Sequence, residues 1–354
     1  MRIIYILEPY HFPGGGIATI YRHVEILNAH GFTAFVGLST KPATDFYQTT
    51  APLLIHAGRL KVQSNDIFVI PEIYPHVFKA LMNTPAKRLM FCQNHYDLPF
   101  TSDSRASIGE FGAHGVIVNS RASSDFFKDV YGITDLPLLP QAIDAGLFAP
   151  AARKTRQIAF MPRKLPRDAA FIEAVFKRRH PQYAAVPWVR IDGVTQREVA
   201  RLMAESECFL SLSHKDSCPY PPLEAMACGC LVAGFHGDGG REYMTPENGW
   251  WADTGDYMAC ADGLAAALTT IDAGGPALNA RLQAMAATVQ RYSPAQRDTT
   301  LLAFWHKQLA ELDLPEQPGQ TVSVALPSTT ASPWWKDWMP PILVRAASRL
   351  KRGR

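Results

Sequence analysis

Asp216 and Glu224 are two carboxylates separated by seven residues, and the positions around them predict a ligand site. Glu224 follows Pro221 and Pro222, and proline suits the start of a helix, where a missing N–H costs little. We therefore expect Glu224 in the first turn of a helix, beside backbone N–H groups that favour anionic groups. A carboxylate there suits hydroxyl groups better than phosphate alone. The pair predicts a site for a nucleotide diphosphate that carries a ribose and a sugar.

Three cations form a second candidate group, in the loop PRKLPRD after a predicted strand at 157–161. Arg163, Lys164 and Arg167 would lie at the carboxyl end of that strand, where ligands of open α/β sheets bind. Cations in this position neutralise the charge that grows on a diphosphate leaving group. The loop therefore predicts a diphosphate site.

Gly14, Gly15 and Gly16 form a third candidate, between a predicted strand at 2–7 and a helix that ends at Gly31. Consecutive glycines let the backbone approach a ligand closely, and N–H groups of the following helix point to the same place. The loop lacks the GxGxxG spacing, and the chain has no GK pair for a P-loop, so a dinucleotide or ATP site is disfavoured. His95 follows a predicted strand at 89–92, which brings it to the same cleft.

The elements that must position these residues alternate regularly along the chain. Apolar runs that predict strands lie at 33–38, 67–70, 88–92, 115–118, 157–161, 188–191, 209–212 and 231–235. Helical patterns lie between them, so we expect parallel sheets covered by helices. Ser120 and Gly132 predict the start and end of one helix, and Thr195 with Glu198 predicts a capping box for another. The Pro- and Gly-containing stretch 138–150 indicates the boundary between two domains, 1–150 and 151–312.

The segment 208–240 resembles the nucleotide-sugar site of the retaining glycosyltransferases of the GT-B fold, family 4 type (glycosyl transferases group 1). That family has two acidic residues separated by seven, followed by EAMACG and a glycine pair; this chain reads LEAMACGC and then GDGGREY. The stretch 138–150 resembles the interdomain segment of the same family, and the likeness covers roughly residues 3–312. The chain departs from the family at Asp216, where Glu is usual, and at Pro219, which cannot donate an N–H.

The resemblance implies an α/β protein of the GT-B fold, with two Rossmann-like domains facing a central cleft and a final helix that crosses back to the first domain. It implies transfer of a hexose-type sugar from a nucleotide-diphosphate sugar to a saccharide or lipid-linked saccharide acceptor, with retention of configuration, in surface polysaccharide or glycolipid synthesis. The implied catalytic residues are His95, Arg163, Lys164 and Asp216. The implied donor-binding residues are Gly14, Gly15, Gly16, Arg167, Thr195, Tyr220 and Glu224.

Glycosyltransferases that hold the diphosphate through a divalent metal use an Asp-x-Asp pair, and this chain has none. We therefore expect metal-independent catalysis with no cofactor, the nucleotide sugar being a substrate. Two alternatives stay open. The chain could be another nucleotide-sugar enzyme of the GT-B fold, such as an epimerase or a hydrolase, or a degenerate sugar-nucleotide-binding protein without catalysis, a reading that Asp216 and Pro219 motivate.

Composition limits the partners and the compartment. The net charge is +3, and residues 333–354 hold six basic residues and one acidic one, so the rest of the chain is slightly acidic and no nucleic-acid partner is expected. Six cysteines without CxxC spacing indicate buried thiols in the cytoplasm. Residues 313–332, rich in Pro, Ser and Thr, predict a flexible linker. The Trp-rich basic tail at 333–354 predicts peripheral attachment to an anionic membrane surface, the inner face of the plasma membrane.

Overall fold

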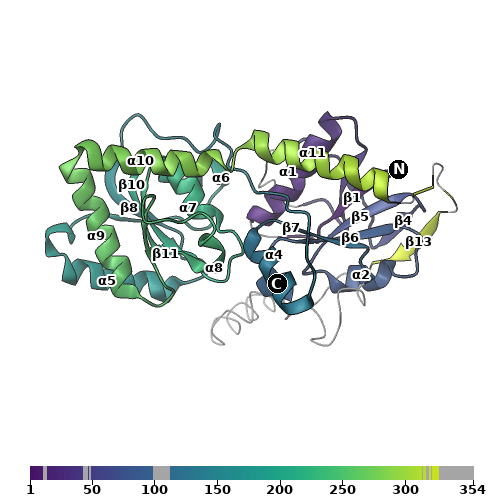
Figure 1. The fold of residues 1–354 in the computed structure, drawn as a ribbon, viewed down its shortest axis with the longest axis horizontal. Coiled ribbons are helices and arrows are strands. Elements are labelled where there is room, and N and C mark those ends of the chain that lie inside the picture. The colour runs from purple at the N-terminus through teal and green to yellow at the C-terminus, as the bar shows by residue number, and fades with distance from the viewer. Residues whose placement is uncertain are drawn as a thin grey trace, which may run out of the picture.

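The computed structural model describes residues 1–10, 14–42, 47, 49–98, 112–312, 314–315, 319 and 321–326. Two sheets form the centres of two lobes that lie next to each other along the long axis of the molecule (Figure 1). The division into two Rossmann-like domains follows the predicted alternation of strands and helices.

The first domain is built on a six-stranded parallel sheet in the order β3-β2-β1-β5-β6-β7. Its middle strands are apolar along their length because helices and loops cover both faces of the sheet. The strands are β1 (Arg2–Ile6), β2 (Ala34–Leu38), β3 (Leu53–Ile55), β5 (Asp66–Pro71), β6 (Lys87–Cys92) and β7 (Gly115–Val118). The helices are α1 (Gly15–Ala29), α2 (Pro75–Leu81), α4 (Arg121–Tyr131) and the short 3-10 helix η1 (His95–Asp97).

The second domain is built on a five-stranded parallel sheet in the order β12-β11-β10-β8-β9. Its strands are β8 (Thr155–Phe160), β9 (Trp188–Arg190), β10 (Ser206–Leu212), β11 (Leu231–Phe235) and β12 (Trp250–Ala252). Its helices are α5 (Pro166–Arg179), η3 (Pro181–Tyr183), α6 (Gln196–Glu205), α7 (Tyr220–Ala227), α8 (Gly237–Gly240), α9 (Tyr257–Ala273) and α10 (Gly275–Gln290).

Helix α11 (Pro294–Glu311) leaves the second domain and packs on the first, as expected for the final helix (Figure 1). Leu301 and Trp305 are fully buried in the same apolar cluster as β1 and α1. The indole N–H of Trp305 donates to the hydroxyl of Tyr5 at 3.2 Å. The chain therefore links the two domains twice, through the stretch at 138–150 and through α11.

The prediction of a flexible linker at 313–332 is wrong for part of that stretch. Strand β13 (Val322–Ala325) pairs antiparallel with β4 (Arg59–Val62) at the side of the first domain. Two exposed charged residues of β4 alternate with two buried apolar ones, the pattern of a strand with one buried face, and β4 and β13 form a separate two-stranded sheet. The tail at 333–354 lies outside the described residues. No helix in the described part of the chain is long and apolar enough to cross a membrane.

Candidate active site

The carboxyl ends of the two sheets face each other, and side chains from both domains meet there. The carbonyl oxygen of Gln93, after β6, accepts a hydrogen bond from Ser217 Oγ of the second domain at 2.5 Å and one from Asn119 Nδ2 of the first at 2.8 Å. The hydroxyls of Tyr220, in α7, and Thr19, in α1, lie 2.8 Å apart. The predicted cleft is thus a contact zone lined by the ends of β1, β6 and β10.

The glycine loop is closely packed, and two of its residues leave no room for a side chain. A Cβ at Gly15 would come within 2.8 Å of the Tyr220 ring, and one at Gly16 within 3.1 Å of the Gln93 side chain. Gly14 is less constrained, since its nearest neighbour would be Ile17 at 3.7 Å. The close approach that the glycine triplet predicted is therefore an approach to protein atoms, to Tyr220 of the second domain at Gly15 and to Gln93 of the loop's own domain at Gly16.

Tyr47 fixes the start of α1. Its hydroxyl accepts from the N–H of Gly14 at 2.5 Å and donates to the carbonyl of the same residue at 2.9 Å. Burial raises the pKa of Tyr47 to about 12, and the nearby positive charge of Arg163 opposes that rise. Arg163 of the second domain thus lies within electrostatic reach of the glycine loop.

Lys164 and Asp216, both predicted as catalytic, form an ion pair across two loops of the second domain. Asp97, in η1 of the first domain, lies near both: burial raises its pKa, Lys164 opposes the rise and Asp216 adds to it. Arg163 is exposed, and among the described residues it has no ion pair or hydrogen bond. The structure therefore brings Arg163, Lys164 and Asp216 to the cleft. Arg167, exposed in the first turn of α5, has no such partner among the described residues.

Glu224 lies one or two residues deeper in its helix than predicted. Helix α7 begins at Tyr220, so Glu224 is its fifth residue, and the first turn of the helix contains no acidic residue. Burial raises the pKa of Glu224 to about 7. Within the described part of the chain, no hydrogen bond or ion pair satisfies its carboxyl group. The expected contact with the unpaired N–H groups of the first turn is wrong, because the helix begins at Tyr220, before the prolines that were predicted to start it.

His95 is buried at the first position of η1 with its ring held on two sides. Its Nδ1 lies 3.1 Å from Ser123 Oγ, and its ring stacks on Phe126 with centroids 4.8 Å apart. Burial lowers the pKa of His95 to about 4, against the opposing effect of Asp238. The imidazole is therefore neutral at physiological pH and suits hydrogen bonding rather than charge neutralisation.

Thr195 caps helix α6, but only half of the predicted capping box is present. Its Oγ1 accepts from the N–H of Glu198 at 3.3 Å. The carboxylate of Glu198 pairs with Arg201 at 2.6 Å instead of returning to the N–H of Thr195. No contact in the described residues joins Thr195 to the other predicted site residues, which lie on neighbouring strands of the sheet.

Glu72 is a buried residue at the site that sequence reasoning missed. It follows β5, and its two carboxylate oxygens accept from the backbone N–H groups of Gln93 at 3.0 Å and Asn94 at 2.8 Å. Burial raises the pKa of Glu72 to about 8. The residue fixes the chain that leads from β6 into His95. Its place directly after a buried strand was the available signal, because carboxyl ends of parallel strands meet at one edge.

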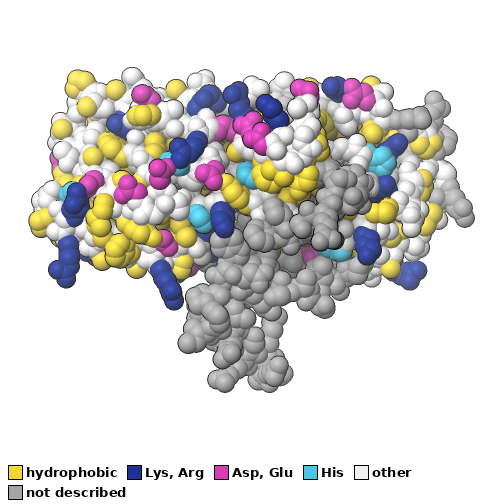
Figure 2. All heavy atoms as spheres, turned by 60° about the horizontal axis from the view of Figure 1, so that its bottom comes forward, with side chains coloured by type: hydrophobic (Ala, Val, Ile, Leu, Met, Phe, Trp, Pro, Cys, Tyr) yellow, Lys and Arg dark blue, Asp and Glu magenta, His cyan; other side chains and the backbone are white. Residues whose placement is uncertain are grey.

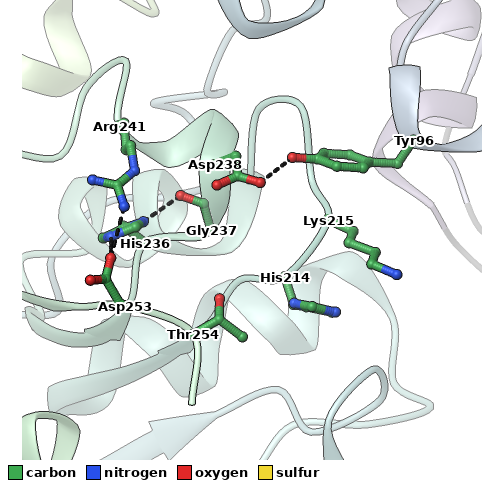
Figure 3. A pocket seen from close by; sticks show the side chains of 9 residues that line it. All are labelled: Tyr96, His214, Lys215, His236, Gly237, Asp238, Arg241, Asp253 and Thr254. Carbon is green, nitrogen blue, oxygen red and sulfur yellow. Dashed lines mark hydrogen bonds and ion pairs between the residues drawn. The ribbon is translucent and has the colours of Figure 1, made fainter. Parts of the chain in front are cut away.

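A cavity of about 240 Å³ opens beside the Asp216 loop, at the carboxyl ends of β10, β11 and β12 (Figure 3). Tyr96 reaches it from the first domain and donates a hydrogen bond to Asp238. Asp253 accepts from Arg241 at 2.7 Å and bonds His236 Nε2 at 2.8 Å. The sequence prediction named none of these residues, because the three strand ends come together only in the folded sheet.

The charge pattern of the surface agrees with the composition. On the face of the second domain seen in Figure 2, basic, acidic and histidine side chains are interspersed rather than separated by sign. The described residues contain no group of three His, Cys, Asp or Glu side chains that could hold a metal ion.

Comparison with known proteins shows a family match over part of the chain and a shared fold. Residues 190–273 match the model of the family Glycosyl transferases group 1. An alpha-1,6-glucosyltransferase of Actinobacillus pleuropneumoniae serotype 7 (strain AP76) is 27% identical over 256 residues, which are 70% of this chain and 77% of that protein. The matched family segment contains Asp216 and Glu224.

Two solved structures show the likeness in three dimensions. The glycosyltransferase from Rickettsia africae ESF-5 has a TM-score of 0.68 at 14% identity, covering 88% of this chain and 99% of its own. Anabaena Alr3699/HepE in complex with UDP-glucose has a TM-score of 0.61 at 15% identity, covering 88% and 100%. The likeness confirms the predicted fold class, an α/β protein of the GT-B type with two Rossmann-like domains.

Proposed function

We propose that this glycosyltransferase of the GT-B fold moves a hexose from a nucleotide-diphosphate sugar to a saccharide or lipid-linked saccharide, with retention of configuration and without a metal, in surface polysaccharide or glycolipid synthesis. Glucose is the first sugar to test, because the Actinobacillus relative is named an alpha-1,6-glucosyltransferase. UDP is the first nucleotide to test, because the similar Anabaena protein is described in complex with UDP-glucose. The relative's name also favours a transferase over an epimerase or a hydrolase.

The position of Arg163 and Lys164 carries the proposal. Lys164 forms an ion pair with Asp216, and Arg163 precedes Lys164 in the same loop. Both cations lie within electrostatic range of the first domain, Arg163 of Tyr47, which holds Gly14 at the start of α1, and Lys164 of Asp97. A diphosphate in this zone would meet cations on one side and backbone N–H groups of the glycine loop on the other. Both kinds of group stabilise phosphate oxygens.

The reaction needs stabilisation of a leaving group more than it needs a nucleophile from the protein. As the bond from the sugar C1 to the diphosphate oxygen breaks, negative charge grows on the diphosphate and the sugar ring becomes oxocarbenium-like. Lys164 would exchange its pairing with Asp216 for a phosphate oxygen, which leaves the Asp216 carboxylate to accept from a sugar hydroxyl. His95, neutral and fixed by Ser123 and Phe126, would hydrogen-bond a second hydroxyl.

A panel of nucleotide diphosphates and nucleotide sugars tests the proposal. Each ligand is added to the protein and the shift in unfolding temperature is measured, since a ligand at about 100 times its dissociation constant adds roughly 2.7 kcal/mol of stability. Ligands that bind are then assayed for transfer and hydrolysis with and without EDTA. We expect one nucleotide family to bind and its glucose derivative to turn over at the same rate in EDTA. Absence of binding and turnover across the panel would contradict the function, and activity restored only by a divalent metal would contradict metal independence.

A further inference from the structure

The cavity at the ends of β10, β11 and β12 offers both hydrogen-bond donors and acceptors. Asp238 and Asp253 supply carboxylate oxygens, Arg241 and Lys215 supply cationic N–H groups, and Tyr96 and Thr254 supply hydroxyls (Figure 3). Hydrogen bonds from His236 and then from Arg241 lower the pKa of Asp253, so it is ionised. Two carboxylates and two cations on the wall balance each other, so the lining favours neither an anion nor a cation, and a lining this polar opposes an apolar ligand.

The His236 and Arg241 side chains hold Asp253 in one orientation. His236 is buried, and its Nδ1 and Nε2 lie 2.5 Å and 2.8 Å from oxygens of Gly237 and Asp253. Arg241 reaches the same Asp253 oxygen at 2.7 Å. Because both partners contact Oδ1, the second carboxylate oxygen is left for a ligand, and 76% of the Asp253 side chain is exposed. The site is therefore oriented before a ligand arrives.

The order of the strands places the cavity at the sugar end of the proposed donor. Thr195 follows β9, Arg163 and Lys164 follow β8, and Asp216 follows β10, so a donor would extend across the sheet in that order. The cavity continues in the same direction past β10 to β11 and β12. Its volume of about 240 Å³ is below the range of about 300–1,000 Å³ typical of drug-sized ligands, which suits one small ring.

We infer that this cavity binds a single neutral sugar ring, with hydroxyls donating to Asp253 and Asp238 and accepting from Arg241 and Thr254. The inference rests on the proposed function, which supplies two sources of such a ring: the sugar of the donor and the acceptor saccharide. Tyr96 and Asp238 come from different domains, so the cavity is complete only while the domains are in contact.

Two variants and a matched control test the inference. Asp253→Asn keeps the size of the side chain and removes its charge, and Thr254→Val removes an exposed hydroxyl with little change in volume. Asp262→Asn is the control, because Asp262 is also bonded by an arginine and a histidine, Arg179 at 2.6 Å and His180 at 2.8 Å, but lies outside the cavity. All three are first compared with the wild type for unfolding temperature.

Binding is measured with methyl α-D-glucopyranoside by saturation-transfer NMR, and with UDP and UDP-glucose by calorimetry. An acceptor subsite predicts about tenfold weaker binding of the methyl glucoside in Asp253→Asn and a smaller loss in Thr254→Val. A donor-sugar subsite predicts that Asp253→Asn binds UDP-glucose about tenfold more weakly, while its affinity for UDP is unchanged. Asp262→Asn should match the wild type in both arms.

The inference is overturned if neither the methyl glucoside nor UDP-glucose binds more weakly to Asp253→Asn and Thr254→Val than to the control. The two failures are distinguishable. A wild-type protein that binds no nucleotide sugar but binds the methyl glucoside through Asp253 would refute the proposed function and keep the sugar site. If the wild type turns over UDP-glucose and no variant binds either ligand more weakly, the proposed function stands and the sugar site is refuted.

Discussion

Glu224 combines two properties that make it a sensitive probe of the donor site. Its carboxyl group has no hydrogen-bond partner among the described residues, and burial raises its pKa to about 7. An ionised carboxylate accepts hydrogen bonds from two ribose hydroxyls, whereas a protonated one has less acceptor capacity. Donor binding and ionisation of Glu224 are therefore linked.

We predict that the KM for UDP-glucose falls as pH rises through about 7, and that Glu224→Gln abolishes this dependence and weakens donor binding.

The free energy of unfolding should fall over the same rise in pH. Because the pKa is higher in the folded than in the unfolded chain, the stabilising contribution of Glu224 is complete below about 4.5 and is lost as pH rises through about 7, by roughly 1–3 kcal/mol. Denaturant titrations of the wild type and of Glu224→Gln from pH 4.5 to 8 measure this loss. The same pH dependence of the free energy of unfolding in both proteins would contradict the assignment of the raised pKa to Glu224.

Arg163 is an exposed cation that the proposed mechanism uses only as charge develops on the leaving group. Arg163→Ala is therefore expected to lower kcat by about 10²-fold while the KM for the donor changes much less. Arg178→Ala, at an exposed position in the last turn of α5 and away from the cleft, is the control for the loss of one positive charge. Steady-state kinetics on UDP-glucose separate the two parameters. A rise in KM with unchanged kcat would assign Arg163 to ground-state binding instead.

At the scale of the elements, local signals predicted most of the fold. Ser120 caps α4 through a 3.2 Å bond from the N–H of Ser123, and Gly132 ends the helix at φ 68°, both as the sequence indicated. Such devices act within a few residues, so the sequence contains them in full. The start of α7 at Tyr220 and the half-formed capping box at Thr195 show the limit, since Glu198 has a second candidate partner in Arg201.

Interactions between distant segments account for the features that sequence reasoning missed. The pairing of β13 with β4 joins Val322 to Val62, and nothing local to either strand specifies the partner. The Tyr96 to Asp238 bond and the cavity beside it depend on how the two domains meet. Candidates such as His95, Arg163 and Asp216 could be predicted because each follows a strand. The pairing of Lys164 with Asp216 depends on neighbouring loops of the folded sheet.

The glycine loop yields a prediction about the contact between α1 and α7. Gly15→Ala places a Cβ within 2.8 Å of the Tyr220 ring, so the ring or the loop must shift and the 2.8 Å contact of Tyr220 with Thr19 is strained. We expect a loss of about 1–3 kcal/mol in the free energy of unfolding. Gly14→Ala is the matched control for stability, because its Cβ meets only Ile17 at ordinary distance. Equal unfolding midpoints for the two variants would show that the interdomain contact is not as close as described.

At the scale of the whole molecule, the described residues of the two domains are connected by two chain crossings and by polar contacts. Helix α11 is anchored in the first domain through Trp305, while Ser217 bonds Gln93 and Glu242 accepts from the N–H of Arg121 at 2.9 Å across the cleft. Polar contacts of this kind exchange readily with water or ligand. The domain contact is thus suited to open for donor entry and to close around it.

The tail at 333–354 lies outside the described residues, and its sequence predicts attachment to a membrane surface. Trp334, Trp335 and Trp338 precede a basic segment, and tryptophan favours the headgroup level of a bilayer while each Lys or Arg adds about 1 kcal/mol at an anionic surface. Deleting 333–354 should abolish sedimentation with anionic liposomes, spare binding to neutral ones if any exists, and leave turnover of a soluble acceptor analogue intact. Undiminished sedimentation of the truncated protein would place membrane attachment elsewhere, and lost turnover would mean that the tail acts at the cleft itself.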